Sequence, residues 1–302
     1  MQKTVSNGKN TVFTGAATAI ITPMKNGGVD YEKFAQLVEF QISHHIDAIV
    51  VCGTTGESST LTDEEHRELI RFCVEKVAGR VPVIAGTGSN DTDYAVDLSK
   101  FACDAGADAL LQVTPYYNKT TQRGLIKHFF AVADAVTKPI ILYNVPSRTG
   151  VNIKPETYAE LAKHENIAAT KEASGSISAV AEIRHACGDA LDVYSGNDDQ
   201  IVPILSLGGK GVISVLSNLL PAETHQICQD FFDGNVKASA DAQIRYLPLI
   251  NSLFCEVNPI PVKTAMNLLG FCTEEIRLPL CEMEDGNKAR LVADMRAAGL
   301  NV

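Results

Sequence analysis

The feature that most constrains this sequence is a regular alternation of short apolar runs with longer amphipathic segments, between about residue 16 and residue 232. The apolar runs are rich in Ile and Val and stop at Gly, Pro, Ser or Thr, which is typical of strands buried on both faces. They cover residues 17–22, 48–53, 82–87, 109–115, 139–146, 167–174, 191–197 and 211–215.

The segments between these runs have the spacing of helices. Apolar residues on one face follow Asp30, which indicates an amphipathic helix. Thr62 and Glu65 form a capping-box pattern, and Pro155 and Pro221 fit the first turns of later helices. Eight strands, each followed by a helix, require parallel strands with right-handed crossovers.

We therefore predict an α/β chain with a closed (β/α)₈ barrel. An open, doubly wound sheet stays as the alternative, since the number of strands does not establish closure. After residue 232 only helices are predicted, over residues 237–254, 261–270 and 286–298, with a rigid Pro-rich break at 258–261. The expected division is a catalytic barrel domain over 1–234 and a C-terminal helical domain over 235–302.

Charge and composition exclude several classes of partner. The 302 residues contain 26 Lys and Arg against 36 Asp and Glu, a net charge of −10, so no basic surface for nucleic acid or for an anionic membrane is expected. No run reaches the ~18 apolar residues of a membrane span. The first 14 residues are polar and lack the apolar core of a signal peptide. We expect a cytoplasmic protein.

No metal or dinucleotide signature stands out. The eight cysteines contain no C-x-x-C pair and fit small buried hydrophobic residues in a reducing compartment. Gly86-Thr87-Gly88 lacks the third glycine of a dinucleotide-binding turn. Asp198 and Asp199 are metal-ligand types, but helix capping is the favoured interpretation. We therefore expect no cofactor.

Active sites of such barrels lie at the carboxyl ends of the strands. The second run ends in Gly53-Thr54-Thr55-Gly56-Glu57-Ser58, where hydroxyl and N–H groups between glycines can bind a small carboxylate. The alternative is a plain turn with a Ser or Thr helix cap.

Lys171 is the most unusual residue of the sixth run, because it lies within an otherwise apolar strand. Side chains alternate along a strand, so Lys171 shares a face with the small Ala169 and Ala173, while Glu172 points to the other face. An inward lysine deprived of water has a lowered pKa and a nucleophilic amine, as a Schiff-base enzyme needs. A lysine that faces outward, or that pairs with a distant carboxylate, remains equally compatible with the pattern.

The fourth and fifth runs end in residues that suit the same chemistry. Tyr143 can move a proton beside an amine, and Arg148 can hold a carboxylate through two parallel hydrogen bonds. Tyr116 and Tyr117 add two phenols at the same rim. A single tyrosine at a strand end is usually a packing residue, but several beside a lysine and an arginine favour a site.

Together these residues resemble the pyruvate-dependent lyase and synthase family that includes N-acetylneuraminate lyase. The resemblance runs from about Thr14 to the C-terminus. Its matching segments are GTTGES at 53–58, AGTGSN at 85–90, TPYYN at 114–118, YNVPSRTG at 143–150, KEASG at 171–175, GVISV at 211–215 and NPIPVK at 258–263.

The resemblance implies that the chain condenses pyruvate with L-aspartate-4-semialdehyde to 4-hydroxy-tetrahydrodipicolinate, the first committed step of lysine biosynthesis through diaminopimelate. An aldolase such as N-acetylneuraminate lyase is the alternative within the family, and Arg148, a partner for a second carboxylate, favours the synthase. A non-catalytic, metabolite-sensing barrel is disfavoured, because the residues needed for catalysis are retained.

The resemblance also implies roles for single residues. Lys171 would form the Schiff base, and Tyr143 would relay protons together with Thr54 and a neighbouring subunit's Tyr117. Thr55 and Arg148 would bind the substrate carboxylates. The main chain at Gly196 and Ile213 would line the site. A tyrosine shared between subunits implies a tight homodimer, commonly paired into a tetramer.

In inhibited members of the family, lysine binds at the dimer interface. The matching positions here are Ser58, Ser59, His66, Asn90, Tyr94 and Tyr116. Tyr94 replaces an acidic residue that holds the ligand's amine, although Asp91 and Asp93 are close in sequence. We therefore expect weak or absent inhibition by lysine.

Overall fold

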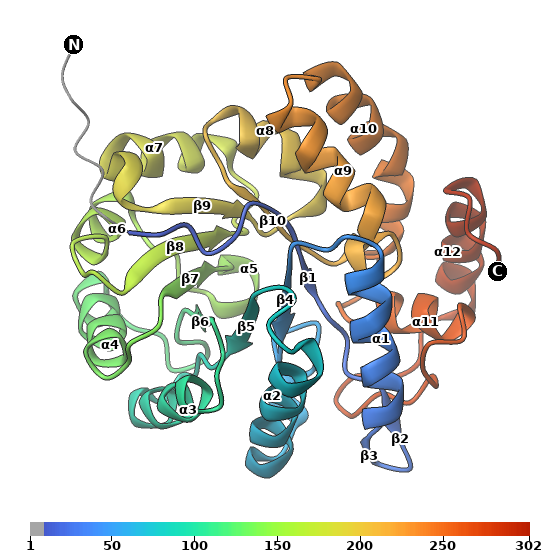
Figure 1. The fold of residues 1–302 in the computed structure, drawn as a ribbon, viewed down its shortest axis with the longest axis horizontal. Coiled ribbons are helices and arrows are strands. Elements are labelled where there is room, and N and C mark those ends of the chain that lie inside the picture. Colours follow the sequence, from blue (N-terminus) through green and yellow to red (C-terminus); the bar gives the residue numbers. More distant parts are fainter. Residues whose placement is uncertain (1–8) are drawn as a thin grey trace.

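The computed structural model describes residues 9–302, so the predictions for the extreme N-terminus lie partly outside the described residues. Eight parallel strands close into a barrel, in the order β1-β10-β9-β8-β7-β6-β5-β4, with β4 paired back to β1 (Figure 1). The strands are β1 Gly15–Ala19, β4 Ala48–Val51, β5 Val83–Gly86, β6 Ala109–Val113, β7 Ile140–Asn144, β8 Ile167–Glu172, β9 Asp192–Ser195 and β10 Gly211–Ser214. The predicted closed barrel is confirmed, and the open sheet is wrong.

A helix follows each barrel strand and lies on the outside of the barrel (Figure 1). These helices are α1 Tyr31–Ser43, α2 Asp63–Val77, α3 Thr92–Asp104, α4 Gln122–Asp134, α6 Pro155–Leu161, α7 Ile177–Cys187, α8 Ile201–Ser206 and α9 Pro221–Phe232. The capping box of Thr62 and Glu65 is formed, and Pro155 and Pro221 begin their helices. Within residues 9–302, no helix has both the length and the apolar character needed to cross a membrane.

Two local features differ from the sequence prediction. Several predicted strands extend too far, because residues just after a strand, such as Val145 at 5% exposure, stay buried and prolong the apolar pattern. A small hairpin, β2 Met24–Lys25 with β3 Gly28–Val29, was not predicted. Its turn is Asn26-Gly27, both in the left-handed region, and an Asn-Gly pair is the sequence signal that indicates such a hairpin.

Closure of the barrel depends on two glycines at the seam between β1 and β10. Gly15 and Gly211 are paired in register, with φ angles of 111° and 153°. A Cβ atom on Gly211 would lie 1.8 Å from the carbonyl oxygen of Gly15. Only glycine therefore allows the first and last strands to approach and complete the ring.

The barrel encloses a small core of its own. Phe13, just before β1, stacks on Tyr194 with ring centroids 4.2 Å apart, and the Tyr194 hydroxyl donates to the Phe13 carbonyl at 2.6 Å. These rings close the end of the barrel where β1 begins. Further interior positions hold Ala17, Ala48 and Ala169, so small residues leave room for longer side chains.

The C-terminal helices pack against the barrel rather than standing apart. They are α10 Val236–Ser252, α11 Ile260–Leu268 and α12 Asp285–Ala297, each within two residues of the predicted bounds. Helix α10 contacts α8 and α9, and Phe271, after α11, lies 4.6 Å from the Phe40 ring of α1. The division at residues 234 and 235 remains a prediction.

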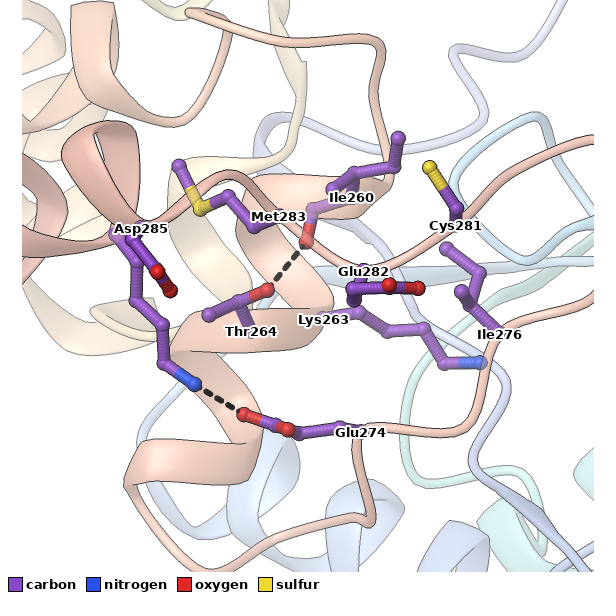
Figure 2. A pocket seen from close by; sticks show the side chains of 10 residues that line it. Ile260, Lys263, Thr264, Glu274, Ile276, Cys281, Glu282, Met283 and Asp285 are labelled. Carbon is purple, nitrogen blue, oxygen red and sulfur yellow. Dashed lines mark hydrogen bonds and ion pairs between the residues drawn. The ribbon is translucent and has the colours of Figure 1, made fainter.

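A buried ion pair joins this C-terminal part to the loop after β4. Lys263 of α11 contacts the carboxylate of Glu57, and the two side chains are 2% and 1% exposed. Lys263 also lines a cavity of about 150 Å³ between α11 and the segment before α12 (Figure 2). On the rim of that cavity Lys288 contacts Glu274, and this pair is half-exposed.

The buried and the half-exposed ion pair predict different losses in the free energy of unfolding when their lysine is replaced. Lys263→Met leaves the Glu57 carboxylate buried without its cation, and we expect the free energy of unfolding to fall by about 3–5 kcal/mol. Lys288→Met, the matched control, should change it by less than about 1 kcal/mol, since water screens that pair. Chemical denaturation measures both, and equal losses in the two variants would contradict the account.

Candidate active site

A cavity of about 400 Å³ opens at the carboxyl ends of the barrel strands. Its lining includes Thr54 and Arg148, which the sequence placed in the site. The same cavity extends to most of the residues predicted for lysine binding, namely Ser58, Ser59, His66, Tyr94 and Tyr116. Asn90 lines a neighbouring cavity instead. The cavity of Figure 2 is separate, because no strand-end residue lines it.

Lys171 lies inside the barrel, not on its outer surface. It is 6% exposed and lies on β8 in register with Tyr143 of β7, over whose ring its Nζ atom sits 4.3 Å from the centroid. Glu172 points into the helix layer, where Asn144 and Tyr158 donate to its carboxylate. The alternative of an outward lysine is therefore wrong.

Burial controls the acidity of this amine. Desolvation lowers the pKa of Lys171 to about 8, the Asp198 carboxylate acts in the opposite direction, and Arg148 lowers the pKa further. An ordinary lysine has a pKa of ~10.4 and is almost wholly charged at neutral pH. A much larger fraction of Lys171 is therefore neutral and nucleophilic near pH 8.

Asp198 is a functional candidate for which the sequence analysis favoured helix capping over metal binding. It is 2% exposed, and its Oδ2 accepts from the backbone N–H groups of Val215 and Leu216, both at 3.0 Å. It thus caps the short helical turn after β10, η4 Leu216–Asn218, and its charge raises the pKa of Lys171. Burial raises the pKa of Asp198.

Within residues 9–302, no group of three or more His, Cys, Asp or Glu is placed to hold a metal ion.

Tyr143 shares the interior with Lys171 and is 7% exposed. Burial raises the pKa of its hydroxyl, while Arg148 and a hydrogen bond with Thr54 lower it. The phenol therefore stays protonated at neutral pH, next to a group that can exchange a proton with it.

The turn after β4 is shaped by backbone hydrogen bonds. Gly56 N–H donates to the Gly53 carbonyl at 3.1 Å, and Glu57 N–H donates to the Thr54 carbonyl at 3.1 Å. The helix cap lies beyond this turn, at Thr62, so the hydroxyl groups of Thr54 and Thr55 do not cap helix α2. Thr55 is 2% exposed, and its hydroxyl accepts from the Asn258 side chain at 3.0 Å.

Arg148 lies in α5 Pro146–Thr149, a single turn at the end of β7. Its Nη2 donates to the Asn258 carbonyl at 3.2 Å, and the residue lines the cavity. The C-terminal segment therefore contacts both of the residues that the sequence suggested for carboxylates. No sequence signal in the strand-end pattern pointed to Asn258 as a contact.

Of the two predicted backbone contacts, Gly196 lies beside Lys171. A Cβ atom on Gly196 would lie 3.2 Å from Lys171 Cε and 2.6 Å from the Cβ of Ala173, so this position must be glycine to admit the lysine. Ile213 is fully buried in the barrel interior.

Tyr117 is the one predicted relay residue that the chain does not bring to Lys171. Its side chain is 91% exposed, and its φ of 67° lies in the left-handed region, which is unusual for a tyrosine. The neighbouring Tyr116 is 36% exposed and lines the cavity.

A closed (β/α)₈ barrel with a desolvated lysine, a buried phenol, and threonine and arginine side chains at the carboxyl ends of its strands is the arrangement of a lysine-dependent, Schiff-base lyase. Residues 12–298 match the model of the dihydrodipicolinate synthetase family, and the chain belongs to that family.

Named relatives agree over nearly the whole chain. A 4-hydroxy-tetrahydrodipicolinate synthase of Clostridium perfringens is 57% identical over 289 residues, which cover 96% of this chain and 99% of the relative. The crystal structure of dihydrodipicolinate synthase from Aquifex aeolicus has a TM-score of 0.94 at 47% identity, covering 95% and 99% of the two chains. The lysine-bound enzyme of Cyanidioschyzon merolae has a TM-score of 0.94 at 42% identity, covering 97% and 100%.

The lowered pKa of Lys171 predicts how its reactivity depends on pH. Because only the neutral amine reacts, covalent labelling of Lys171 should rise with pH and reach half its maximum near pH 8 in the folded protein. In the unfolded chain the same residue should titrate near ~10.4. Mass spectrometry of the labelled peptide measures both curves.

A pair of variants tests the role of the carboxylate. Asp198→Asn should move the folded midpoint downward, since that charge raises the pKa of Lys171. Asp199→Asn, at an exposed neighbouring position, should leave it in place. A wild-type midpoint near that of the unfolded chain would contradict the account.

Proposed function

We propose that this member of the dihydrodipicolinate synthetase family acts as a 4-hydroxy-tetrahydrodipicolinate synthase through Lys171. It condenses pyruvate with L-aspartate-4-semialdehyde. The observation that carries the mechanism is the Lys171 amine, desolvated inside the barrel with its Nζ against the ring of Tyr143. Its pKa of about 8 supplies a nucleophile at physiological pH.

The first half of the reaction activates pyruvate. The neutral amine of Lys171 attacks the ketone carbon, water leaves, and the nitrogen and carbon become joined in an iminium ion. Loss of a proton from the adjacent methyl group then gives an enamine, which is a carbon nucleophile. Tyr143 carries the protons that these steps move, with Thr54 as its neighbour in the relay.

The second half joins the two substrates. The enamine carbon attacks the aldehyde carbon of the semialdehyde, and its oxygen takes a proton to become a hydroxyl. The semialdehyde's own amine then attacks the iminium carbon, which closes the ring and displaces the Lys171 amine. Every atom of the product comes from the two substrates, so the proposal requires no metal or organic cofactor.

The substrate carboxylates are bound by groups of the site itself and are not attracted by the overall charge of the protein. Both substrates are anionic while the chain carries a net charge of −10, so attraction must come from the site itself. Thr55 binds the pyruvate carboxylate with its hydroxyl and backbone N–H. Arg148 binds the carboxylate of the semialdehyde, and the main chain at Gly196 and Ile213 lines the space between them.

We further propose that the active protein is a homodimer, commonly paired into a tetramer. The support is Tyr117, which is 91% exposed in a left-handed conformation that costs energy unless surrounding contacts maintain it. In the dimer this phenol enters the neighbouring subunit and completes the relay of Tyr143 and Thr54. The proposed location is the cytoplasm, and neither nucleic acid nor a membrane is a proposed partner.

The role of Arg148 predicts a selective loss. Arg148→Lys keeps the charge but removes the two-pronged contact, so KM for the semialdehyde should rise about tenfold to a hundredfold, while KM for pyruvate changes little. Arg123→Lys, on the exposed face of α4, is the matched control and should match the wild type.

The assay follows product formation from pyruvate and L-aspartate-4-semialdehyde, with N-acetylneuraminate cleavage measured in parallel. The wild type should form product and leave N-acetylneuraminate intact. Cleavage of N-acetylneuraminate without condensation would overturn the proposed reaction.

We propose that lysine inhibits this protein weakly or not at all. The hydroxyl of Tyr94, at the position where inhibited relatives have an acid, donates to Asp63 at 2.9 Å and so is already engaged. Millimolar lysine should leave the wild-type rate nearly unchanged, whereas Tyr94→Glu should gain sensitivity. Strong inhibition of the wild type would defeat this proposal.

A further inference from the structure

One residue of the C-terminal part reaches both proposed carboxylate sites. Asn258 is 6% exposed, and its side-chain Nδ2 donates to the hydroxyl of Thr55 at 3.0 Å. Its main-chain carbonyl accepts from Arg148 Nη2 at 3.2 Å. Thr55 follows β4 and Arg148 follows β7, so Asn258 joins two strand ends that lie apart in the barrel order.

The segment that carries Asn258 is held firmly at this place. Lys263, five residues further on, forms the buried pair with Glu57, two residues after Thr55. Lys263 also donates to the Glu275 carbonyl at 2.6 Å, and the Arg277 N–H donates to the other Glu57 oxygen at 3.3 Å. Both ends of the contact between Asn258 and Thr55 are therefore anchored by buried polar groups.

The direction of this hydrogen bond decides what the Thr55 hydroxyl can do. A hydroxyl has one hydrogen to donate, and here its oxygen already accepts from an amide N–H. The hydrogen of Thr55 is thus left for another acceptor, such as a carboxylate in the site. The Oδ1 atom of Asn258 is buried without a hydrogen-bond partner among the described residues.

We propose that Asn258 is a positioning residue that sets the Thr55 hydroxyl as a hydrogen donor to the carboxylate of the first substrate. Its carbonyl separately restrains Arg148 for the second substrate. The C-terminal helical part is then needed for substrate binding as well as for stability. This inference rests on the proposed function, because it takes pyruvate as the ligand of Thr55.

The test compares Asn258→Asp with the wild type. A carboxylate can only accept, so it takes the Thr55 hydrogen and adds a repelling charge, and KM for pyruvate should rise at least about tenfold. KM for the semialdehyde should change by less than about twofold, since the carbonyl that holds Arg148 is retained. A purely structural role would not separate the two constants.

Two controls keep the result specific. Asn267→Asp alters a second asparagine of the same region, whose Nδ2 donates to the Cys272 carbonyl at 2.9 Å, and it should leave both constants unchanged. In a Thr55→Val background, which lacks the hydroxyl, Asn258→Ala should add no further increase in KM for pyruvate, whereas in the wild-type background it should raise that constant.

The outcomes separate this inference from the proposed function. A wild type that fails to condense the two substrates overturns the function on which the inference rests. An active wild type with an unchanged pyruvate KM in Asn258→Asp overturns the role of Asn258 alone. The same holds if Asn258→Ala acts equally with and without the Thr55 hydroxyl.

Discussion

The properties of the site depend on the enclosure of the Lys171 amine inside the closed barrel. A lysine side chain in a low-dielectric interior loses hydration, and its charged form becomes costly. The barrel accepts Lys171 because small residues and Gly196 leave room around it, and because Asp198 offsets part of the cost. The opposed effects leave a pKa of about 8, low enough for a reactive amine and high enough for its later protonation.

The carboxyl ends of the strands cannot complete such a site alone. The turn after β4 is joined to helix α11 by the ion pair of Glu57 with Lys263, and Asn258 contacts both Thr55 and Arg148. The C-terminal helices are therefore bonded to the same loop that carries the proposed pyruvate subsite. Loss of this part would both expose apolar surface and release Thr55 and Arg148, the groups proposed to bind the substrate carboxylates.

Much of this arrangement follows from the local sequence pattern. The period of two along the sixth run predicts that Lys171 shares a face with alanines, and the eightfold alternation predicts the barrel that makes this face interior. The pattern could not determine whether the sheet closes, because closure depends on a seam where Gly15 and Gly211 meet.

Contacts between residues that lie far apart in the sequence could not be predicted from the local sequence pattern either. Asp198 does cap a helical turn, but its effect on the pKa of Lys171 depends on the strand order, which places β9 beside β8. Asn258 lies in a segment that matched the family motif, yet no spacing rule relates it to Thr55, about two hundred residues earlier in the chain. Tyr117 is similar, since the proposed partner for its exposed ring is another chain.

The central claim is that Lys171 is the nucleophile toward pyruvate. The direct measurement is reduction of the protein with borohydride in the presence of pyruvate, followed by peptide mapping with mass spectrometry. We predict one reduced pyruvyl group per chain, on Lys171, and none when pyruvate is omitted. An unmodified chain, or an adduct on any other lysine, would contradict the account.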